Sequence, residues 1–431
     1  MKLPEKVNIL LLGGGGREHA LARSLAASPR CGRLHIAPGN AGTSACGTNV
    51  DIEATNFGAI KQFVLNHGVG LVVVGPEEPL TKGIVDFFES DPELKFVPVA
   101  GPDEAGARLE GSKDFAKGFM TRHSIPTAAY RTFTKEDVAD GEAFLATLRP
   151  PYVLKADGLA AGKGVIIAPT LDEARAELRE MLGGKFGAAG SRVVIEEYMH
   201  GIECSVFVAT DGAGYRILPV AKDYKRVGEG DTGPNTGGMG AVSPVPFADD
   251  GFMRRVEERI VRPTVEGLAA EGIVYRGFIF IGLMNVGGEP RVIEYNVRMG
   301  DPETEVVFPR ITSDAVELFE GIVCGTLDKY ELTVTPQWAT TVVCVSGGYP
   351  GDYRKGLPIT GLGVSGRPET IVFHAGTRRA GEQTVTAGGR VLTVTSLAAT
   401  MRQALDASYR AIAGIGFEGM AFRRDIGRDL E

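Results

Sequence analysis

The sequence predicts a multidomain protein of mixed α/β and α+β class. In the first hundred residues, short continuous apolar runs alternate with helix-like segments, which is typical of a parallel sheet covered on both faces. From about residue 113, apolar and polar positions alternate in several runs, which favours antiparallel strands. The last hundred residues contain valine- and threonine-rich runs and predict a small β-rich unit. At about 150 residues per domain, the 431 residues suit two or three domains.

Three strands are predicted in the first part of the chain. The run at 7–12 ends in four consecutive glycines and is followed by a helix with apolar residues at helical spacing. The runs at 34–37 and 69–74 end in the turn sequences Pro-Gly-Asn and Gly-Pro-Glu-Glu-Pro. Ligands of such sheets bind at the carboxyl ends of the strands, so these turns are candidate binding segments.

Later elements are predicted from the same signals. Segment 228–240 has six glycines in thirteen residues and no apolar periodicity, so a long functional loop is expected there. A closing helix is expected at about 397–413. The expected strands are 152–156, 192–196, 204–209, 215–220, 341–345 and 390–394.

Composition limits the classes of partner. The net charge of −8 makes non-specific binding to nucleic acid or to an anionic membrane a poor hypothesis, and no apolar run is long enough to span a bilayer. The five cysteines are scattered and form no CxxC pair, which suits a reducing compartment, so a cytoplasmic location is expected. The 59 glycines follow no G-X-Y period, which excludes collagen.

The glycines at 13–16 suggest an anion site, because glycine lets the backbone approach an anion and the following helix offers free N–H groups. A dinucleotide fingerprint fails, because Glu18 occupies the position of its last glycine. A phosphate site of another kind remains, and a plain strand-to-helix turn is the alternative. The glycine-rich loop 158–164 follows Lys155 and ends at Gly164. It suits the binding of a triphosphate, with an ordinary hairpin turn as the alternative. It lacks the P-loop pattern.

Two polar strand ends complete the candidate site. Segment 193–203 could read an adenine edge and bind ribose hydroxyls, although a solvated strand end explains it as well. In the strand beginning at Arg291, the side chains of Glu294, Asn296 and Arg298 share one face. A carboxylate and an amide oxygen suit Mg²⁺, and a polar solvent face is the alternative.

No GxSxG, HExxH or Cys/His arrangement supplies a nucleophile. The chemistry that fits these cations is phosphoryl transfer to a substrate carboxylate, in which the protein mainly positions and neutralises the reactants. A nucleotide-binding oxidoreductase and an ATP-sensing module without turnover are the competing classes. The failed fingerprint argues against the first, and the Glu294 and Asn296 pair argues against the second.

Eight motifs, in order, resemble the ATP-grasp ligases, and most closely the family of phosphoribosylamine–glycine ligases. One departure is Met299, where that family usually has Phe or Leu; another is the absence of an acidic metal ligand at 278–284. The motifs are GGGGREHAL, PGN, VGPEEPL, GSKDFAK, KADGLAAGKGV, EEYMHGIECS, DYKRVGEGDTGPNTGGMGA and EYNVRMGDPETE.

The resemblance implies three domains: a Rossmann-like parallel sheet at 1–108, an ATP-grasp domain at 109–335 with a mobile lid at about 124–196, and a β-rich domain at 336–431. It implies that ATP, glycine and 5-phosphoribosylamine react through glycyl phosphate to glycinamide ribonucleotide, ADP and phosphate. Mg²⁺ or Mn²⁺ is the implied metal, the partners are small molecules rather than nucleic acid or membrane, and a monomer is expected.

The resemblance also implies roles for individual residues. Arg298 would bind the transferring phosphoryl group or the glycine carboxylate, and Asp223 the glycine ammonium. Glu294 and Asn296 would hold the metal. The implied ATP contacts are Lys113, Lys155, Gly162, Lys163, Gly164, Glu196, Glu197, Tyr198 and Glu203. The implied sugar-phosphate contacts are Gly15, Gly16, Asn40 and Glu77.

Overall fold

A computed structural model of the chain describes residues 2–158, 164–364 and 369–431. Gly162 and Lys163 lie outside the described residues. The largest sheet has nine strands in the order β11-β10-β16-β5-β4-β1-β2-β3, with β17 also paired to β16. Its N-terminal strands are β1 (Val7–Gly13), β2 (Cys31–Pro38), β3 (Thr48–Asn49), β4 (Leu71–Val74) and β5 (Val99–Pro102).

These N-terminal strands are parallel, and β1, β4 and β5 are buried on both faces. Along β1, Leu10 and Leu12 pack into one hydrophobic cluster, while Ile9 and Leu11 pack into another on the opposite face. Because consecutive side chains of a strand point to opposite faces, a strand with two buried faces must be apolar throughout. The parallel sheet expected from the continuous apolar runs is confirmed.

The antiparallel half of the large sheet joins the parallel half through one short contact. Strand β16 (Tyr275–Val286) pairs with β5 at Tyr275 and Arg276. Farther along, β16 also pairs with β10 (Ile202–Thr210) and with β17 (Glu289–Asn296). Strand β10 in turn pairs with β11 (Tyr215–Ile217). One continuous sheet therefore places the residues after β17 beside the turns of the N-terminal strands.

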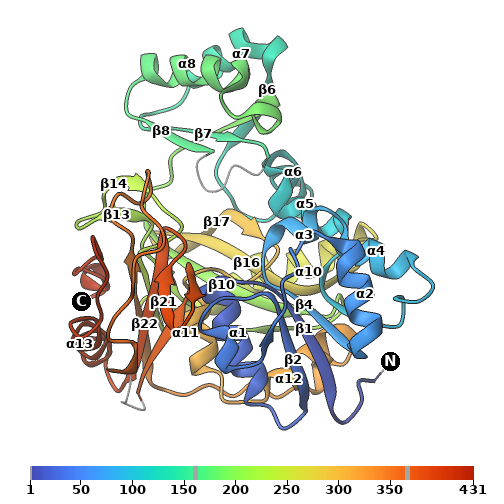
Figure 1. Cartoon of the computed structure of the whole chain (residues 1–431). Coiled ribbons are helices and arrows are strands. Elements are labelled where there is room, and N and C mark those ends of the chain that lie inside the picture. Colours follow the sequence, from blue (N-terminus) through green and yellow to red (C-terminus); the bar gives the residue numbers. More distant parts are fainter. Residues whose placement is uncertain (1, 159–163, 365–368) are drawn as a thin grey trace.

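A separate four-stranded sheet stands above this body (Figure 1). It has the order β6-β9-β7-β8 and is covered by helices α7 and α8. We refer to this unit as the lid sheet. Its elements are β6 (Tyr130–Thr134), α7 (Val138–Leu145), β7 (Tyr152–Ala156), β8 (Val165–Ala168), α8 (Leu171–Glu180) and β9 (Arg192–Glu196).

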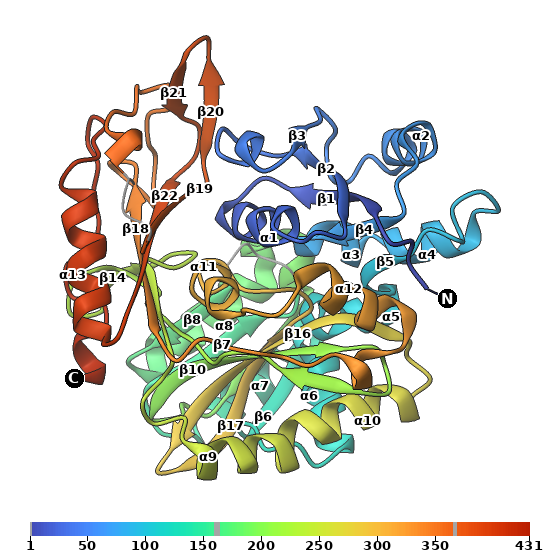
Figure 2. The ribbon, with the colours of Figure 1, turned by 90° about the horizontal axis from the view of Figure 1, so that it is seen from below.

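The third sheet has the order β12-β15-β18-β22-β19 and combines central and C-terminal segments. Figure 2 shows its C-terminal strands and helix α13 on one side of the molecule, with β19 next to α1 of the N-terminal part. Its strands are β12 (Lys222–Asp223), β15 (Gly240–Ser243), β18 (Trp338–Val345), β22 (Arg390–Ala398) and β19 (Thr370–His374). Strands β20 (Thr377–Ala380) and β21 (Gln383–Thr386) form a separate two-stranded sheet, and helix α13 (Met401–Ile412) packs on β18 and β22.

Segment 228–240 is not the continuous loop that the sequence predicted. Strands β13 (Arg226–Gly228) and β14 (Thr232–Asn235) form a hairpin, and Gly240 begins β15. Its turn includes Asp231 with a positive φ of 53°. Backbone hydrogen bonds suffice to pair two strands, so this glycine-rich hairpin needs no apolar periodicity.

The remaining helices cover the sheets, and no helix in the described residues is both long and apolar enough to cross a membrane. Helix α6 begins at Lys113 because Ser112 caps it by accepting a hydrogen bond from the Phe115 amide at 3.1 Å. The helices are α1 (Gly16–Ala26), α2 (Phe57–His67), α3 (Glu77–Thr81), α4 (Ile84–Ser90), α5 (Glu104–Gly111), α6 (Lys113–Arg122), α9 (Asp250–Val256), α10 (Arg262–Ala270), α11 (Thr304–Val307) and α12 (Ala315–Cys324).

The junction between β5 and β16 gives a test of this architecture. A Cβ atom at Gly277 would lie 3.0 Å from the Cα atom of Gly101, so the backbones of β5 and β16 would have to move apart slightly to accept it. Gly277→Ala is therefore expected to lower the free energy of unfolding by about 1–3 kcal/mol. Gly183→Ala is the control, because no atom lies within 4 Å of its added Cβ. Equal melting temperatures for the two variants would contradict the close packing of the junction.

Candidate active site

Three charged side chains meet where the lid sheet faces α6. In the antiparallel pair β7–β9, Val153 is opposite Glu196, so Lys155 lies diagonally from Glu196 on the same face. The Lys155 Nζ atom is 2.9 Å from Glu196 Oε1, and Lys117 Nζ is 3.1 Å from Glu196 Oε2. All three side chains are almost fully buried. Two ammonium groups thus share one carboxylate, which leaves an excess positive charge in this site.

Lys117 is held by a further contact, because its Nζ atom donates a hydrogen bond to Thr127 Oγ1 at 2.7 Å. Burial lowers its pKa to about 8, although Glu196 opposes that shift. Lys117 therefore loses its proton much more readily than an exposed lysine.

Lys113 stands at the start of α6 and reaches the edge of the glycine loop. Its Nζ atom donates to the Gly158 carbonyl at 3.3 Å, directly before the segment 159–163. Burial lowers the pKa of Lys113, and Lys155 adds to the effect while Glu294 opposes it. Lys155 also donates to the Ile293 carbonyl at 3.1 Å, which ties β7 to β17.

Glu197 and Tyr198 lie at the end of β9. The Glu197 amide donates to the Ala129 carbonyl at 2.9 Å, and its carboxylate accepts from the Ala129 amide at 3.0 Å. The Glu197 carboxylate also pairs with Arg291 at 3.3 Å. Tyr198 is exposed and packs edge-on against His200. The Glu197 carboxylate is thus engaged by the protein, while the Tyr198 ring faces the outside.

Several cationic side chains of the site interact electrostatically with the Glu294 carboxylate. Its Oε1 atom lies 3.9 Å from Lys225 Nζ, which is also 3.2 Å from Glu203 Oε2. Burial by itself would raise the pKa of Glu294, but Lys225, Lys155, Lys113 and Arg298 together hold it below its usual value. Glu294 is therefore ionised at neutral pH.

Lys225 keeps its charge as well. Glu203 is the main cause that raises its pKa well above the ordinary value, against the effect of burial, and Asp223 and Glu294 add to it. For Asp223, burial raises the pKa, with Lys225 opposing and Glu203 reinforcing the shift. Burial and the neighbouring Asp223 raise the pKa of Glu303 to about 7.

Arg298 links the parallel and antiparallel parts of the large sheet. Its guanidinium lies 3.3 Å from Glu77 of α3 and 2.9 Å from Glu110 of α5. Glu110 also accepts the Val297 amide at 2.8 Å, which fixes the backbone beside Arg298. Because two carboxylates hold it, the Arg298 side chain is oriented before any ligand binds.

Glu294 and Asn296 are the candidate metal ligands. Both offer hard oxygen atoms, and Asn296 Oδ1 is 3.5 Å from the Arg298 guanidinium. Within the described residues, no three His, Cys, Asp or Glu side chains are grouped so as to hold a metal ion by themselves. This donor set suits a divalent cation that takes its other oxygen ligands from phosphates and water.

The predicted sugar-phosphate residues form a tight junction with the C-terminal part. The Asn40 Nδ2 group donates to the carbonyls of Gly14 at 3.0 Å and His374 at 2.7 Å, while its Oδ1 atom accepts the Gly42 amide at 2.8 Å. The side chain of Asn40 is thus used to join two loops and β19.

The surroundings of Gly15 and Gly16 are acidic. The Gly15 amide donates to the Glu18 carboxylate at 2.5 Å, and a Cβ atom on Gly15 would lie 3.1 Å from Asp301. A Cβ atom on Gly16 would collide with Glu305, whose carboxyl oxygens are buried without a hydrogen-bond partner. Two of these carboxylates are partly compensated, because Glu18 pairs with Arg17 at 2.6 Å and Asp301 with Arg390 at 3.0 Å.

Sequence reasoning missed four charged residues of this region. Lys117 lies one helical turn after Lys113, and Lys225 lies two residues after Asp223 in an extended segment, so periodicity alone could have indicated both. Glu110 carried no such signal, because its partner Arg298 is distant in the sequence. Arg17 pairs with the next residue, Glu18, but it also donates to the distant Met299 carbonyl.

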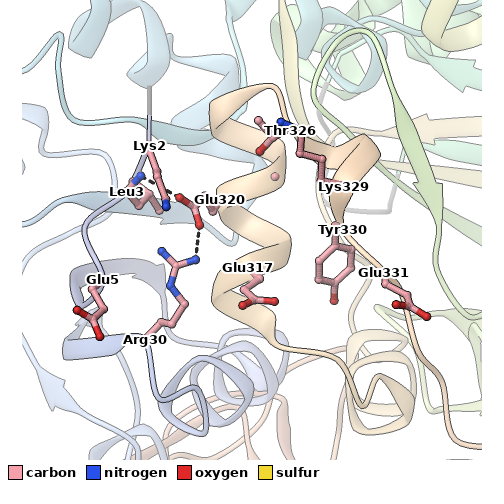
Figure 3. A pocket seen from close by; sticks show the side chains of 11 residues that line it. Lys2, Leu3, Glu5, Arg30, Glu317, Glu320, Thr326, Lys329, Tyr330 and Glu331 are labelled. Atoms are coloured by element: carbon pink, nitrogen blue, oxygen red, sulfur yellow. Dashed lines mark hydrogen bonds and ion pairs between the residues drawn. The ribbon is translucent and has the colours of Figure 1, made fainter.

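A polar cavity of about 790 Å³ lies elsewhere, between the N-terminal segment and α12 (Figure 3). Arg30 and Glu320 pair across it, and Glu320 accepts the Leu3 amide at 3.0 Å. None of the predicted site residues lines this cavity. Its charged groups tie the start of the chain to α12.

Comparisons with known proteins agree with this geometry. Models of the phosphoribosylglycinamide synthetase N domain, ATP-grasp (A) domain and C domain match residues 7–110, 111–304 and 339–429. A relative from Vibrio cholerae, named phosphoribosylamine–glycine ligase, is 47% identical over 425 residues, covering 98% of each chain. The chain belongs to the phosphoribosylamine–glycine ligase family. Family membership confirms the resemblance and the ligase activity predicted from the sequence.

Solved structures confirm the predicted fold class of this family member. The crystal structure of the Thermotoga maritima phosphoribosylamine–glycine ligase has a TM-score of 0.82 and 35% identity, covering 97% of this chain and 100% of that one. The biotin carboxylase domain of Hydrogenobacter thermophilus 2-oxoglutarate carboxylase, solved with MgADP and bicarbonate, has a TM-score of 0.74. At 16% identity, over 97% of this chain and 92% of that one, it shows the shared fold alone.

The pKa of Lys117 predicts a pH dependence of ATP binding. Above about pH 8, Lys117 loses its charge and Glu196 is balanced by Lys155 alone, so Lys155 is less available to a phosphate. The KM for ATP is expected to rise between pH 7 and pH 9. Lys117→Arg stays charged and should show little of this rise; an equal rise in both proteins would contradict the assignment.

The same pKa shift of Lys117 affects the stability of the fold in the opposite direction: ATP binding is expected to weaken as the pH rises, whereas the folded state is stabilised. Because the unfolded chain keeps this proton to about pH 10.5, it binds more protons than the folded protein above pH 8. This residue therefore makes the free energy of unfolding increase between pH 8 and pH 10.5. A loss of ATP binding over that range cannot come from unfolding driven by Lys117.

Proposed function

We propose that this ligase joins glycine to 5-phosphoribosylamine in two steps at the Glu294 site. A glycine carboxylate oxygen attacks the γ-phosphorus of ATP, the bond to the bridging oxygen breaks, and ADP leaves. The amine of phosphoribosylamine then attacks the glycyl carbonyl carbon, giving glycinamide ribonucleotide and phosphate, with loss of a proton from the amine. The observation that carries this proposal is the half-buried Glu294 carboxylate, whose Oε1 atom lies 3.9 Å from Lys225 Nζ and whose pKa four cationic side chains hold below its usual value.

We place the ATP phosphates between the lid sheet and β17. The buried ammonium group of Lys155 and the half-buried one of Lys113 would face this space, and the loop through Gly162, Lys163 and Gly164 would close over the phosphates. A carboxylate that approaches ATP meets repulsion of about 4 kcal/mol per charge pair at 4 Å and an effective dielectric of about 20. The two lysines would offset part of that repulsion.

The nucleoside is proposed to lie along the end of β9. Backbone groups of Glu196, Glu197 and Tyr198 would contact the adenine, and Glu203 would accept from ribose hydroxyls. Glu203 is half exposed and is bound to the protein through Lys225, so its carboxylate can reach a ligand. Closure of the segment at about 124–196 over ATP is part of this proposal.

ATP-grasp enzymes use ATP with a divalent metal ion, and Mg²⁺ or Mn²⁺ is proposed here. Glu294 and Asn296 would hold the ion with their oxygen atoms, and the ionised state of Glu294 fits that role. When bound, such an ion neutralises charge on the transferring phosphoryl group. Arg298, held by Glu77 and Glu110, would orient that group or the glycine carboxylate.

Glycine and phosphoribosylamine are proposed to bind on the two sides of Arg298. Asp223, beside Lys225, would accept the glycine ammonium. Phosphoribosylamine would lie near Gly15, Gly16, Asn40 and Glu77, and the acidic surroundings of the glycines favour its amine and hydroxyl end there.

Compartment and assembly are also proposed. In the described residues all five cysteines are free, which supports a reducing compartment such as the cytoplasm. A monomer is proposed, because Glu294, Arg298 and their cationic and acidic neighbours all come from a single chain.

Glycine dependence is the decisive test of the reaction. Phosphate release from ATP, in the presence of Mg²⁺ and phosphoribosylamine, is expected to require glycine. A coupled phosphate assay with glycine, formate or bicarbonate measures this directly. Release supported by formate or bicarbonate would indicate a different ATP-grasp reaction, and ATP binding without turnover with any carboxylate would indicate a binding module.

The metal assignment predicts the effect of Glu294→Gln. The amide has nearly the same shape but no charge, so turnover is expected to fall by about 100-fold or more while the melting temperature stays close to that of the wild type. Glu289→Gln is the matched control, because Glu289 is an exposed residue of the same strand. Wild-type turnover in Glu294→Gln would remove Glu294 from the metal site.

A further inference from the structure

The segment 222–225 presents two faces with different partners. In an extended chain, consecutive side chains point to opposite sides. Lys225 faces Glu203 and Glu294 in the active site, and Asp223 interacts electrostatically with the same charged groups. Lys222 and Tyr224 face the other way, toward the end of the chain.

Asp429 receives both side chains of that second face. The Tyr224 hydroxyl donates to Asp429 Oδ1 at 2.6 Å, and Lys222 Nζ is 3.0 Å from Oδ2. The Lys222 ammonium also lies 3.8 Å from the centre of the Tyr224 ring. Burial alone would raise the pKa of Asp429, but Tyr224 and Lys222 lower it, so its carboxylate is ionised when it makes these contacts.

Arg423 binds the hairpin that follows the segment. Its side chain is 2% exposed, and it donates to the Arg226 carbonyl at 3.1 Å and to Asp231 at 2.7 Å. Asp425 pairs with Arg423 at 2.8 Å and accepts the Gly230 amide at 2.7 Å. Figures 1 and 2 both show β14 next to the C-terminal part of the chain.

We propose that Arg423, Asp425 and Asp429, which we call the C-terminal clamp, position Asp223 and Lys225 for the reaction with glycine. The inference rests on the proposed function, which assigns the glycine ammonium to Asp223. The clamp residues bind only the back of segment 222–226 and its hairpin, so they are positioning residues. They make the C-terminal domain a part of the active-site framework.

The backbone and the side chains of this segment are held by different partners. Strand β12 pairs with β15 at Lys222 and Asp223, and the Tyr224 amide donates to the Gly240 carbonyl at 3.0 Å. These backbone bonds set the path of the chain. The side chains of Lys222 and Tyr224, which are themselves buried, add contacts with the exposed Asp429, and rotation of the segment would break both.

The experiment compares Asp429→Asn and Tyr224→Phe with the wild type. Both changes conserve shape while weakening the clamp, and the second leaves every charge in place. The KM for glycine is expected to rise about 10-fold, whereas the KM for ATP should change less than about 2-fold. The size of the first effect is taken from residues that support a metal ligand from behind, whose removal typically costs about 10-fold or more. Glu431→Gln is the control, because Glu431 is exposed and pairs only with Arg402.

The outcomes separate this inference from the proposed function. If glycine does not support phosphate release by the wild type, the proposed function fails and the clamp variants are not needed to show it. If the wild type requires glycine, an unchanged KM for glycine in both variants overturns the clamp. An equal rise in the KM values for glycine and ATP, or a loss of activity that follows only the melting temperature, also overturns it.

Discussion

The need to hold several partly buried positive charges together organises this protein. Lys113, Lys155, Lys225 and Arg298 all act on the Glu294 carboxylate, yet they come from α6, the lid sheet, the segment after β12 and the end of β17. Like charges in a poorly solvated site repel one another, so the arrangement persists only where carboxylates compensate them. The continuous large sheet, the lid sheet and the hairpin are the supports that bring these separate segments to one place.

The compensating carboxylates are distributed in a way that prepares the site for ATP. Glu196 is shared between Lys117 and Lys155, and Glu203 and Glu294 lie on either side of Lys225. Arg298 is held in the same manner by Glu77 and Glu110. Apart from Lys113, which donates to the Gly158 carbonyl, each of these cations has a carboxylate partner within the protein. Preorganised charges of this kind cost little reorganisation when the reaction occurs.

Much of the fold could be predicted from the sequence. The expected strand at 152–156 coincides with β7, and that at 192–196 with β9, because both are short apolar runs with clear ends. The prediction for segment 228–240 was wrong, since its hairpin depends on backbone pairing and on Arg423, nearly two hundred residues away. Of the candidate site, Lys155 and Glu294 were predicted from motifs, whereas no pattern in the sequence indicated the ion pair of Arg298 with Glu110.

The amino-acid sequence by itself thus determined where the backbone makes tight turns, which strands are buried on both faces, and which side chains share a strand face. These are local properties, set by glycine content and by the periods of helix and strand. Only the tertiary structure decided which cation meets which carboxylate, that Asn40 joins β19 to the N-terminal loops, and that Asp429 lies behind Tyr224. The two residues of such a pair are far apart in the sequence. No local sequence pattern encodes how close they lie in space, because the packing of the sheets sets that spatial distance.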